Sequence, residues 1–203
     1  MFDIRRCTSQ HIDDVVQIHL DAFTNFFLTR LGRSFLRQLY LAFLRDDAAS
    51  CFIALDSKKT VVGFIAGTNT PDLFFRNLLL FNWHKFLCAS LTLMIHHPIT
   101  VGRKLLGAIF YRGDFHDLPF KELSLISSFA VDPKVQGKGC GQELLAVFEN
   151  WTQAHGGKGV YLLTDASDNT KTNQFYLKNG FLLNDIVKKS DGREMNRFVK
   201  KFL

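Results

Sequence analysis

The chain has 203 residues, of which 47% are hydrophobic and 22% charged, and its formal net charge at pH 7 is +6. This composition excludes a disordered or fibrous protein, and the length suits one well-buried domain rather than two independent cores. The mild positive charge favours anions in general, so it does not distinguish nucleic acid, anionic lipid and phosphorylated cofactors as partners.

The cysteines and the first residues indicate the compartment. Cys7, Cys51, Cys88 and Cys140 are far apart in the sequence and form no C-x-x-C pair or Cys/His ligand run. We therefore expect neither a disulfide framework nor a metal site. Residues 1–6 lack the long apolar core of a secretory signal. A cytoplasmic protein is expected.

The N-terminal third predicts a strand, two helices and a hairpin. Residues 4–8 are strand-like, and Ser9 is a suitable N-cap for a helix whose apolar positions recur at helical spacing. A second helix is expected from Ser34 to Leu44, where apolar side chains recur at three- and four-residue steps. The short apolar runs over 51–55 and 61–66 then indicate an antiparallel hairpin.

A long apolar and aromatic stretch follows, and we interpret residues 71–117 as a helical insertion in a single domain spanning 1–203. The window from Leu78 to Ile95 approaches the length of a membrane span. However, Asn82, His84 and Lys85 lie inside it and would be costly in hydrocarbon. A helical lid or dimer surface is therefore favoured over membrane contact.

The C-terminal half predicts a parallel strand pair. A strand from Leu123 to Val131, a helix from Gly141 to Trp151 and a strand from Val160 to Thr164 follow one another. This order implies that the two strands lie parallel. The remaining predicted elements are a helix over 170–179 and a hairpin with strands over 181–187 and 194–202.

The segment from Val131 to Gly141, V-D-P-K-V-Q-G-K-G-C-G, carries the clearest chemical signal. It leaves a strand, turns at a proline and enters a helix through three glycines at alternate positions. Glycine permits close backbone approach, and a helix start presents unpaired N–H groups with a partial positive charge. The loop can therefore hold a pyrophosphate with main-chain donors, and Lys138 adds charge.

Two familiar phosphate-binding motifs do not fit this loop. A Walker A motif needs Ser or Thr after Gly-Lys, whereas residues 137–139 are Gly-Lys-Gly. A dinucleotide fingerprint needs glycine at position 142, which is Gln142, and its turn after Val131 would be shorter. Asp165 could imitate the ribose-binding acid of that fingerprint, but the loop itself does not match.

What remains is a Q-x-x-G-x-G pattern made by Gln136, Gly139 and Gly141. A second segment, residues 169–181, reads N-T-K-T-N-Q-F-Y-L-K-N-G-F. It is similar to the pattern N-x-x-A-x-x-F-Y-x-x-x-G-F, with Thr172 at the usual alanine. In these two segments, and in their order and separation, the chain resembles the GNAT superfamily of acyl-CoA N-acyltransferases.

The resemblance implies an α/β (α+β) fold with a mixed, mostly antiparallel central sheet, a splayed parallel strand pair and flanking helices. It also implies transfer of an acetyl group from acetyl-CoA to a primary amine by direct attack. Residues 129–131 would face the pantetheine arm, residues 136–141 would hold the pyrophosphate, and Asn169 would bind near the thioester. The implied cofactor-binding residues are Phe129, Ala130, Val131, Gln136, Gly137, Lys138, Gly139, Cys140, Gly141, Asn169 and Tyr176.

Tyr176 is the implied acid that protonates the departing thiolate. It lies seven residues after Asn169, about two helical turns, so both side chains can face the same end of the cofactor. A phenol pKa of about 10 and a thiol pKa of about 8.5 are close enough for proton sharing. The base that accepts the amine proton stays open among Glu122, Asp165 and ordered water.

A different class of function also fits these residues: a non-catalytic acyl-CoA-binding or partner-binding module on the same fold. In that case Tyr176 is a packed aromatic and Asn169 a helix cap. For the enzyme, the expected partner is a small-molecule or peptide amine, with a homodimer as a further possibility. No nucleic-acid partner is expected, because basic and aromatic residues are not interleaved.

Overall fold

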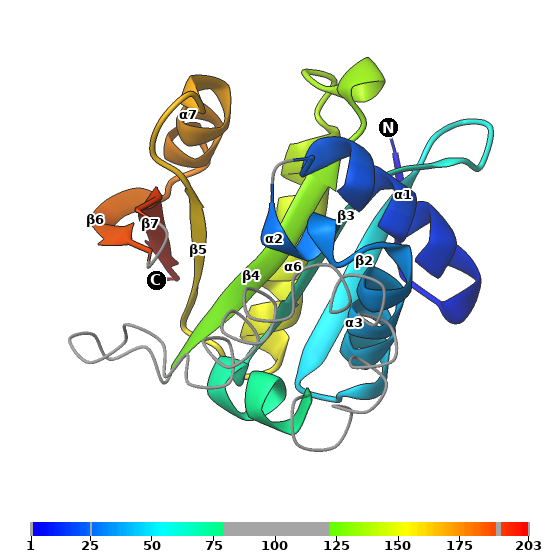
Figure 1. The fold of residues 1–203 in the computed structure, drawn as a ribbon, viewed down its shortest axis with the longest axis horizontal. Coiled ribbons are helices and arrows are strands. Elements are labelled where there is room, and N and C mark those ends of the chain that lie inside the picture. Colours follow the sequence, from blue (N-terminus) through cyan, green and yellow to red (C-terminus); the bar gives the residue numbers. More distant parts are fainter. Residues whose placement is uncertain (1, 25, 79–121, 190–191, 203) are drawn as a thin grey trace.

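The computed structural model describes residues 2–24, 26–78, 122–189 and 192–202 (Figure 1). Within them, seven strands form one sheet in the order β1-β2-β3-β4-β5-β7-β6. The strands are β1 (Asp3–Arg6), β2 (Ala49–Leu55), β3 (Val61–Thr68), β4 (Leu123–Val131), β5 (Gly159–Asp165), β6 (Leu182–Lys188) and β7 (Glu194–Lys201). The helices are η1 (Ser9–His11), α1 (Ile12–Ala22), α2 (Phe27–Arg30), α3 (Arg33–Arg45), η3 (Pro133–Val135), α6 (Cys140–Ala154) and α7 (Thr170–Lys178).

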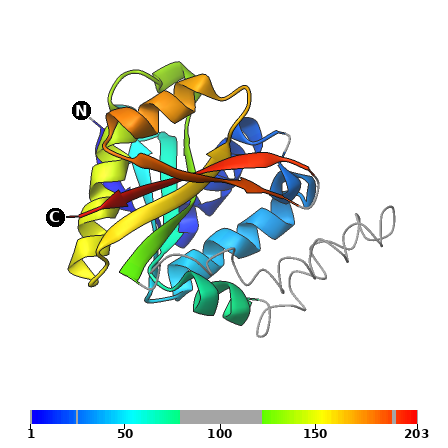
Figure 2. The same ribbon diagram turned by 90° about the vertical axis from the view of Figure 1, so that its left-hand side faces the viewer.

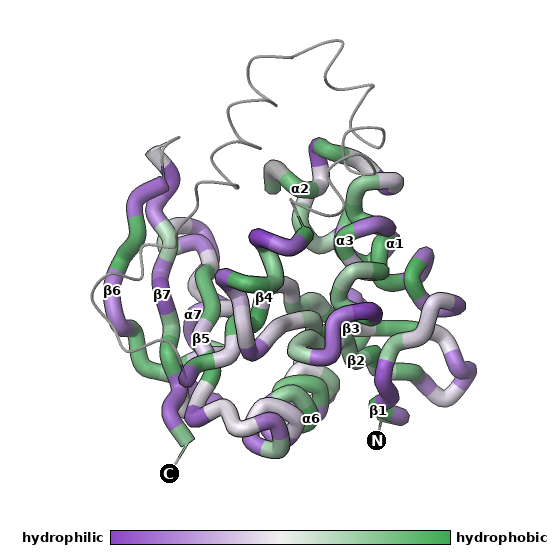
Figure 3. Tube along the Cα trace, turned by 90° about the horizontal axis from the view of Figure 1, so that it is seen from below, coloured by the Kyte–Doolittle hydropathy of each residue, from purple (hydrophilic) through white to green (hydrophobic). Residues whose placement is uncertain are grey.

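Helices cover both faces of the sheet, and each face has its own apolar core. Helices α1 and α3 pack on one face and α6 on the other, so that β2 and β3 lie between them (Figure 3). Both strands are buried along their whole length. In β2, Cys51 and Ile53 face the α1/α3 core, while Phe52 and Ala54 face α6. This alternation follows from the two-residue period of a strand.

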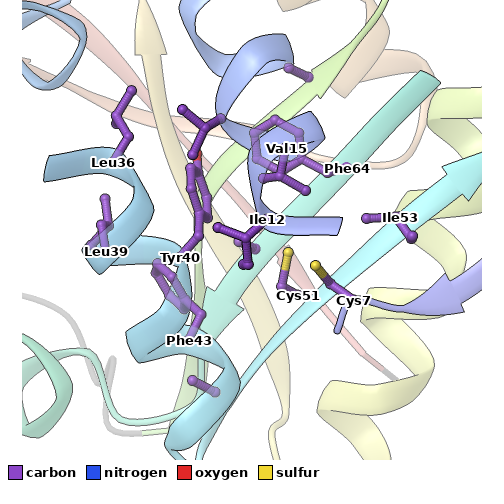
Figure 4. Close-up of a cluster of buried hydrophobic side chains, with 14 of the residues drawn as sticks. Cys7, Ile12, Val15, Leu36, Leu39, Tyr40, Phe43, Cys51, Ile53 and Phe64 are labelled. Atoms are coloured by element: carbon purple, nitrogen blue, oxygen red, sulfur yellow. The ribbon is translucent and has the colours of Figure 1, made fainter. Parts of the chain in front are cut away.

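The core under α1 and α3 contains two thiols that the sequence separates widely. The Cys7 N–H donates to the Cys51 carbonyl at 2.8 Å, and both cysteines are buried and free. Figure 4 shows the two sulfur atoms side by side in this core. Cys140, the third cysteine that the structure describes, is also buried and free.

A β-bulge in β4 changes which face its side chains cover. Ala66 of β3 pairs with Ser128 and Gly67 pairs with Ile126, which leaves Ser127 as an extra residue. Ile126 and Phe129 consequently both belong to the α6 core, although three residues separate them. A regular strand would have placed them on opposite faces.

The parallel strands β4 and β5 pair over a short stretch only. Their register runs from Leu123 opposite Gly159 to Leu125 opposite Tyr161. Beyond this point β5 continues to Asp165 paired with β7 alone. Figure 1 shows the two strands diverging from their paired end toward α7. The predicted mostly antiparallel sheet with a splayed parallel pair is therefore confirmed.

The predicted insertion lies mostly outside the described residues. Residues 71–78 are helical, and residues 79–117 are not described. In the described part of the chain, no helix has the length and apolar character needed to cross a bilayer. The stretch after Leu78 that approached such a length is among the residues not described.

Candidate active site

Two side chains that follow β4 shape the segment from Val131 to Gly141, which we call the glycine loop. The Asp132 carboxylate accepts the Lys134 N–H at 2.9 Å, which caps η3 behind Pro133. The Gln136 amide then folds back and donates from Nε2 to the Val131 carbonyl at 3.1 Å. The glutamine of the Q-x-x-G-x-G pattern therefore ties the loop to the strand that it leaves.

The two central glycines of the loop are needed for their backbone conformation. Gly137 has φ of 76° and Gly139 has φ of 90°, in the left-handed region that favours glycine. A Cβ built at Gly137 would meet nothing within 4 Å, and one at Gly139 would meet only the tip of Gln142 at 4.0 Å. The space over these residues is therefore open among the described atoms.

The main-chain donors of this loop are available for a ligand. In the described part of the chain, the N–H groups of residues 137–142 donate no hydrogen bond to another residue. The first bond in this region is donated by the Glu143 N–H to the Gly139 carbonyl at 3.1 Å. These donors lie at the start of α6, where the helix dipole adds positive potential. A diphosphate fits both features.

Cys140 and Gly141 serve the packing of this helix start. Cys140 is buried, and burial, with a smaller effect from the Glu143 carboxylate, raises the pKa of its thiol to about 11. The thiol is therefore neutral near pH 7 and does not act as a nucleophile. A Cβ at Gly141 would lie 3.2 Å from the ring of Phe175, so this glycine allows α7 to approach.

Asn169 connects the start of α7 to the end of β5. Its Nδ2 donates to the Thr164 hydroxyl at 2.7 Å and to the Asp165 carbonyl at 3.3 Å. Asn169 occupies the N-cap position, yet its side chain makes no capping hydrogen bond. The side chain instead positions α7 relative to β5.

Tyr176 is buried among aromatic rings. Its ring centroid lies 5.4 Å from that of Phe181, 5.7 Å from Phe198 and 6.5 Å from Phe129 of β4. Burial raises the pKa of the Tyr176 phenol above its ordinary value, whereas the sequence argument assumed an ordinary one. The phenol is therefore protonated at neutral pH.

The structure does not bring the two carboxylate candidates together. Glu122 lies beside the paired end of β4 and β5, and its Oε1 is 2.7 Å from the Lys158 Nζ. At about 3.3 Å per residue, the nine residues of β4 place Glu122 about 30 Å from the glycine loop. Asp165 lies at the opposite end of β5, where both carboxylate oxygens accept from Arg193 at 2.5 Å.

Several residues near this end of β5 were not singled out from the sequence. The Arg193 guanidinium, besides binding Asp165, lies 4.1 Å from the ring centroid of Phe26. This contact joins the β6–β7 turn to the segment between α1 and α2, as Figure 2 shows. The sequence does not indicate the ion pair between Arg193 and Asp165, because 28 residues separate them.

A buried polar pair lies between α1 and α3. The His19 Nδ1 and the Tyr40 hydroxyl are 2.6 Å apart. Burial lowers the pKa of the His19 imidazole to about 4, so the ring is neutral at physiological pH.

Part of the chain matches a known protein family, and solved structures have a similar fold. The model of the acetyltransferase (GNAT) family matches residues 87–181, and no curated protein matches the chain. Solved structures share the fold. Ard1 from Thermoplasma volcanium has a TM-score of 0.64 at 18% identity, covering 100% of this chain and 98% of that one.

Two further structures have the same fold. A ribosomal-protein-alanine N-acetyltransferase from Brucella melitensis has a TM-score of 0.63 at 16% identity, covering 98% of this chain and 99% of its own. A candidate streptothricin acetyltransferase from Bacillus anthracis, in complex with acetyl coenzyme A, has a TM-score of 0.52 at 16% identity, covering 81% and 68%. The matched segment, residues 87–181, includes the glycine loop, and these solved structures share the fold of this chain.

Proposed function

We propose that the chain transfers an acetyl group from acetyl-CoA to a primary amine by direct attack of the amine on the thioester. The observation that carries this proposal is the set of N–H groups over residues 137–142 that donate to no described residue. They lie at the start of α6, directly after the strand that separates from its parallel neighbour. An acyl-CoA carries a diphosphate that these N–H groups can bind. It also carries an extended amide arm that can pair with the separated strand.

The loop residues bind the cofactor in this proposal. The main chain of residues 136–141 holds the diphosphate, and the exposed Lys138 adds a positive charge. Residues 129–131 lie on the part of β4 that does not pair with β5, so their main chain is placed to pair with the pantetheine arm. The acetyl coenzyme A in the Bacillus anthracis structure supports the choice of cofactor.

Tyr176 donates the proton that the reaction requires at sulfur. The amine nitrogen forms a bond to the carbonyl carbon, the carbon–sulfur bond breaks, and the sulfur takes a proton from the Tyr176 hydroxyl. The raised pKa keeps this phenol protonated before the reaction. It also makes the phenol a weaker acid than an exposed tyrosine, so the hydrogen bond to sulfur carries much of the stabilisation.

Ordered water is the favoured base in this proposal. Glu122 is about 30 Å along β4 from the loop and is paired with Lys158. Asp165 is close to the N-terminal end of α7, but Arg193 occupies both of its carboxylate oxygens. Neither carboxylate is therefore well placed to accept the amine proton directly.

One observation favours the alternative of a binding module without turnover: Tyr176 packs against Phe181 and Phe198 as a core residue would. The two functions separate in one assay. Titration calorimetry with acetyl-CoA measures binding, and thiol release with peptides, polyamines and amino sugars measures transfer. Binding with thiol release supports the enzyme. Binding with no release across the panel supports the module, and absence of binding contradicts both.

A further inference from the structure

Three polar side chains follow one face of α7 at four- and three-residue steps: Asn169, Asn173 and Tyr176. Residues at this spacing are neighbours on a helix surface. The two outer residues belong to the site already described. Asn173, between them, occupies a variable position of the second sequence motif.

The Asn173 side chain has one end bound and one end without a partner. Its Nδ2 donates to the Asp165 carbonyl at 3.4 Å, while its Oδ1 is buried and accepts no hydrogen bond from the residues that the structure describes. Rotating the amide by half a turn would set Oδ1 against the Asp165 carbonyl oxygen, so the orientation is fixed by β5. A buried acceptor without a donor is rare in native proteins and unfavourable.

The position of this oxygen relates it to the unpaired parts of β4 and β5. Asn173 contacts the last residue of β5, and Tyr176, one helical turn later, contacts Phe129 of β4. The face of α7 that carries Asn173 therefore touches both strands beyond Leu125, where they no longer pair. In the proposed function, this is where the pantetheine arm lies.

The neighbouring Asn169 is held to β5 in a similar way. The Asn169 Nδ2 is engaged by the Thr164 hydroxyl and the Asp165 carbonyl. The pantetheine arm carries two amide N–H groups, each of which needs an acceptor once it leaves water. We propose that Asn173 Oδ1 accepts a hydrogen bond from a pantetheine amide N–H, which makes Asn173 a further cofactor-binding residue. This inference rests on the proposed function.

The test compares ligands with and without the pantetheine arm. Calorimetry measures the Kd of acetyl-CoA and of adenosine 3′,5′-bisphosphate for the wild type, Asn173→Ala and the isosteric Asn173→Leu. The matched control is Gln174→Ala, which removes an exposed amide from the next position of the same helix. Thermal unfolding of each variant is recorded first, so that only folded protein is compared.

We expect both Asn173 variants to bind acetyl-CoA about tenfold more weakly and to bind adenosine 3′,5′-bisphosphate as the wild type does. Gln174→Ala should leave both affinities unchanged. Unchanged acetyl-CoA affinity in the Asn173 variants, or equal weakening of both ligands, overturns the assignment while the proposed function stands. A wild type that binds neither ligand overturns the proposed function itself.

Discussion

Phe175 packs directly over Gly141, so closely that a Cβ at position 141 would lie 3.2 Å from its ring. Gly141 is in the first turn of α6, which presents the free N–H groups, and Phe175 precedes Tyr176 on α7. The contact therefore sets the distance between the proposed diphosphate site and the proposed acid. Phe129 joins the same contact, with its ring centroid 5.8 Å from that of Phe175.

Gly141→Ala tests this contact. The added methyl group should push Phe175 outward and move Tyr176 with it, because packed aromatic rings give way only together. We expect kcat to fall about tenfold or more, with a smaller change in the Kd of acetyl-CoA. Steady-state kinetics and calorimetry measure the two quantities. A variant with wild-type kcat would show that Phe175 adjusts without moving Tyr176.

Gly139→Ala tests the loop conformation, with Gly156→Ala as its control. Both glycines have positive φ, 90° and 81°, and a Cβ at either meets nothing closer than 4.0 Å. Each substitution should therefore cost a similar free energy of unfolding, about 1–2 kcal/mol. Only Gly139→Ala should weaken acetyl-CoA binding, by about tenfold or more, because only its N–H lies in the proposed site. Equal affinities in the two variants would count against the loop.

Tyr176→Phe tests the acid. Removing the hydroxyl should lower kcat by about 10² to 10⁴ with little change in KM, whereas Tyr161→Phe, a buried substitution in β5, should not lower kcat to this extent. Since the Tyr176 pKa is raised, its deprotonation should not cause a decline in rate below about pH 10. An unchanged kcat would assign Tyr176 to packing alone.

Gly67→Ala should destabilise the fold strongly. A Cβ there would lie 2.2 Å from the Leu125 carbonyl oxygen and 2.4 Å from the ring of Phe148, which packs α6 onto the bulged strand. We expect a loss of about 3 kcal/mol or more in the free energy of unfolding. Gly63→Ala, whose nearest contacts are at 3.2 Å, should lose about 1 kcal/mol. Urea unfolding of both variants checks the difference.

His19 should make stability depend on pH between about 6.5 and 4. Burial lowers the pKa of His19 to about 4 in the folded protein, so in this window the unfolded chain binds the proton and the folded chain does not. Stability should therefore fall as the pH falls, by up to about 3 kcal/mol from this group. His19→Gln should lose this part of the dependence in urea unfolding at pH 7 and pH 4.5. Parallel pH profiles would show that His19 is not its source.

Local patterns predicted most of the fold and the position of the glycine loop. The strand over 123–131 was located to the residue because its apolar run ends at Val-Asp-Pro, where a strand must stop. The parallel pair followed from the strand, helix, strand order alone. The loop was recognisable because glycine spacing at a helix start reports backbone conformation, which depends on neighbouring residues only.

What could not be predicted depends on contacts between distant residues. Nothing in the Ser127-Ser128 pair indicates the bulge at Ser127. This bulge nevertheless places Phe129 on the face of the sheet that α6 covers. The pairing of Asp165 with Arg193, a partner 28 residues away, has no signal in the sequence. His19 is a polar residue on an apolar helix face, and only the hydroxyl of Tyr40 explains its place.

The most direct test of the central claim is a crystal structure of the protein with acetyl-CoA. We predict that diphosphate oxygens lie about 2.7–3.2 Å from main-chain nitrogens of residues 137–142, with the thioester sulfur within hydrogen-bonding reach of the Tyr176 hydroxyl. A diphosphate bound elsewhere, with these N–H groups facing solvent, would contradict the claim.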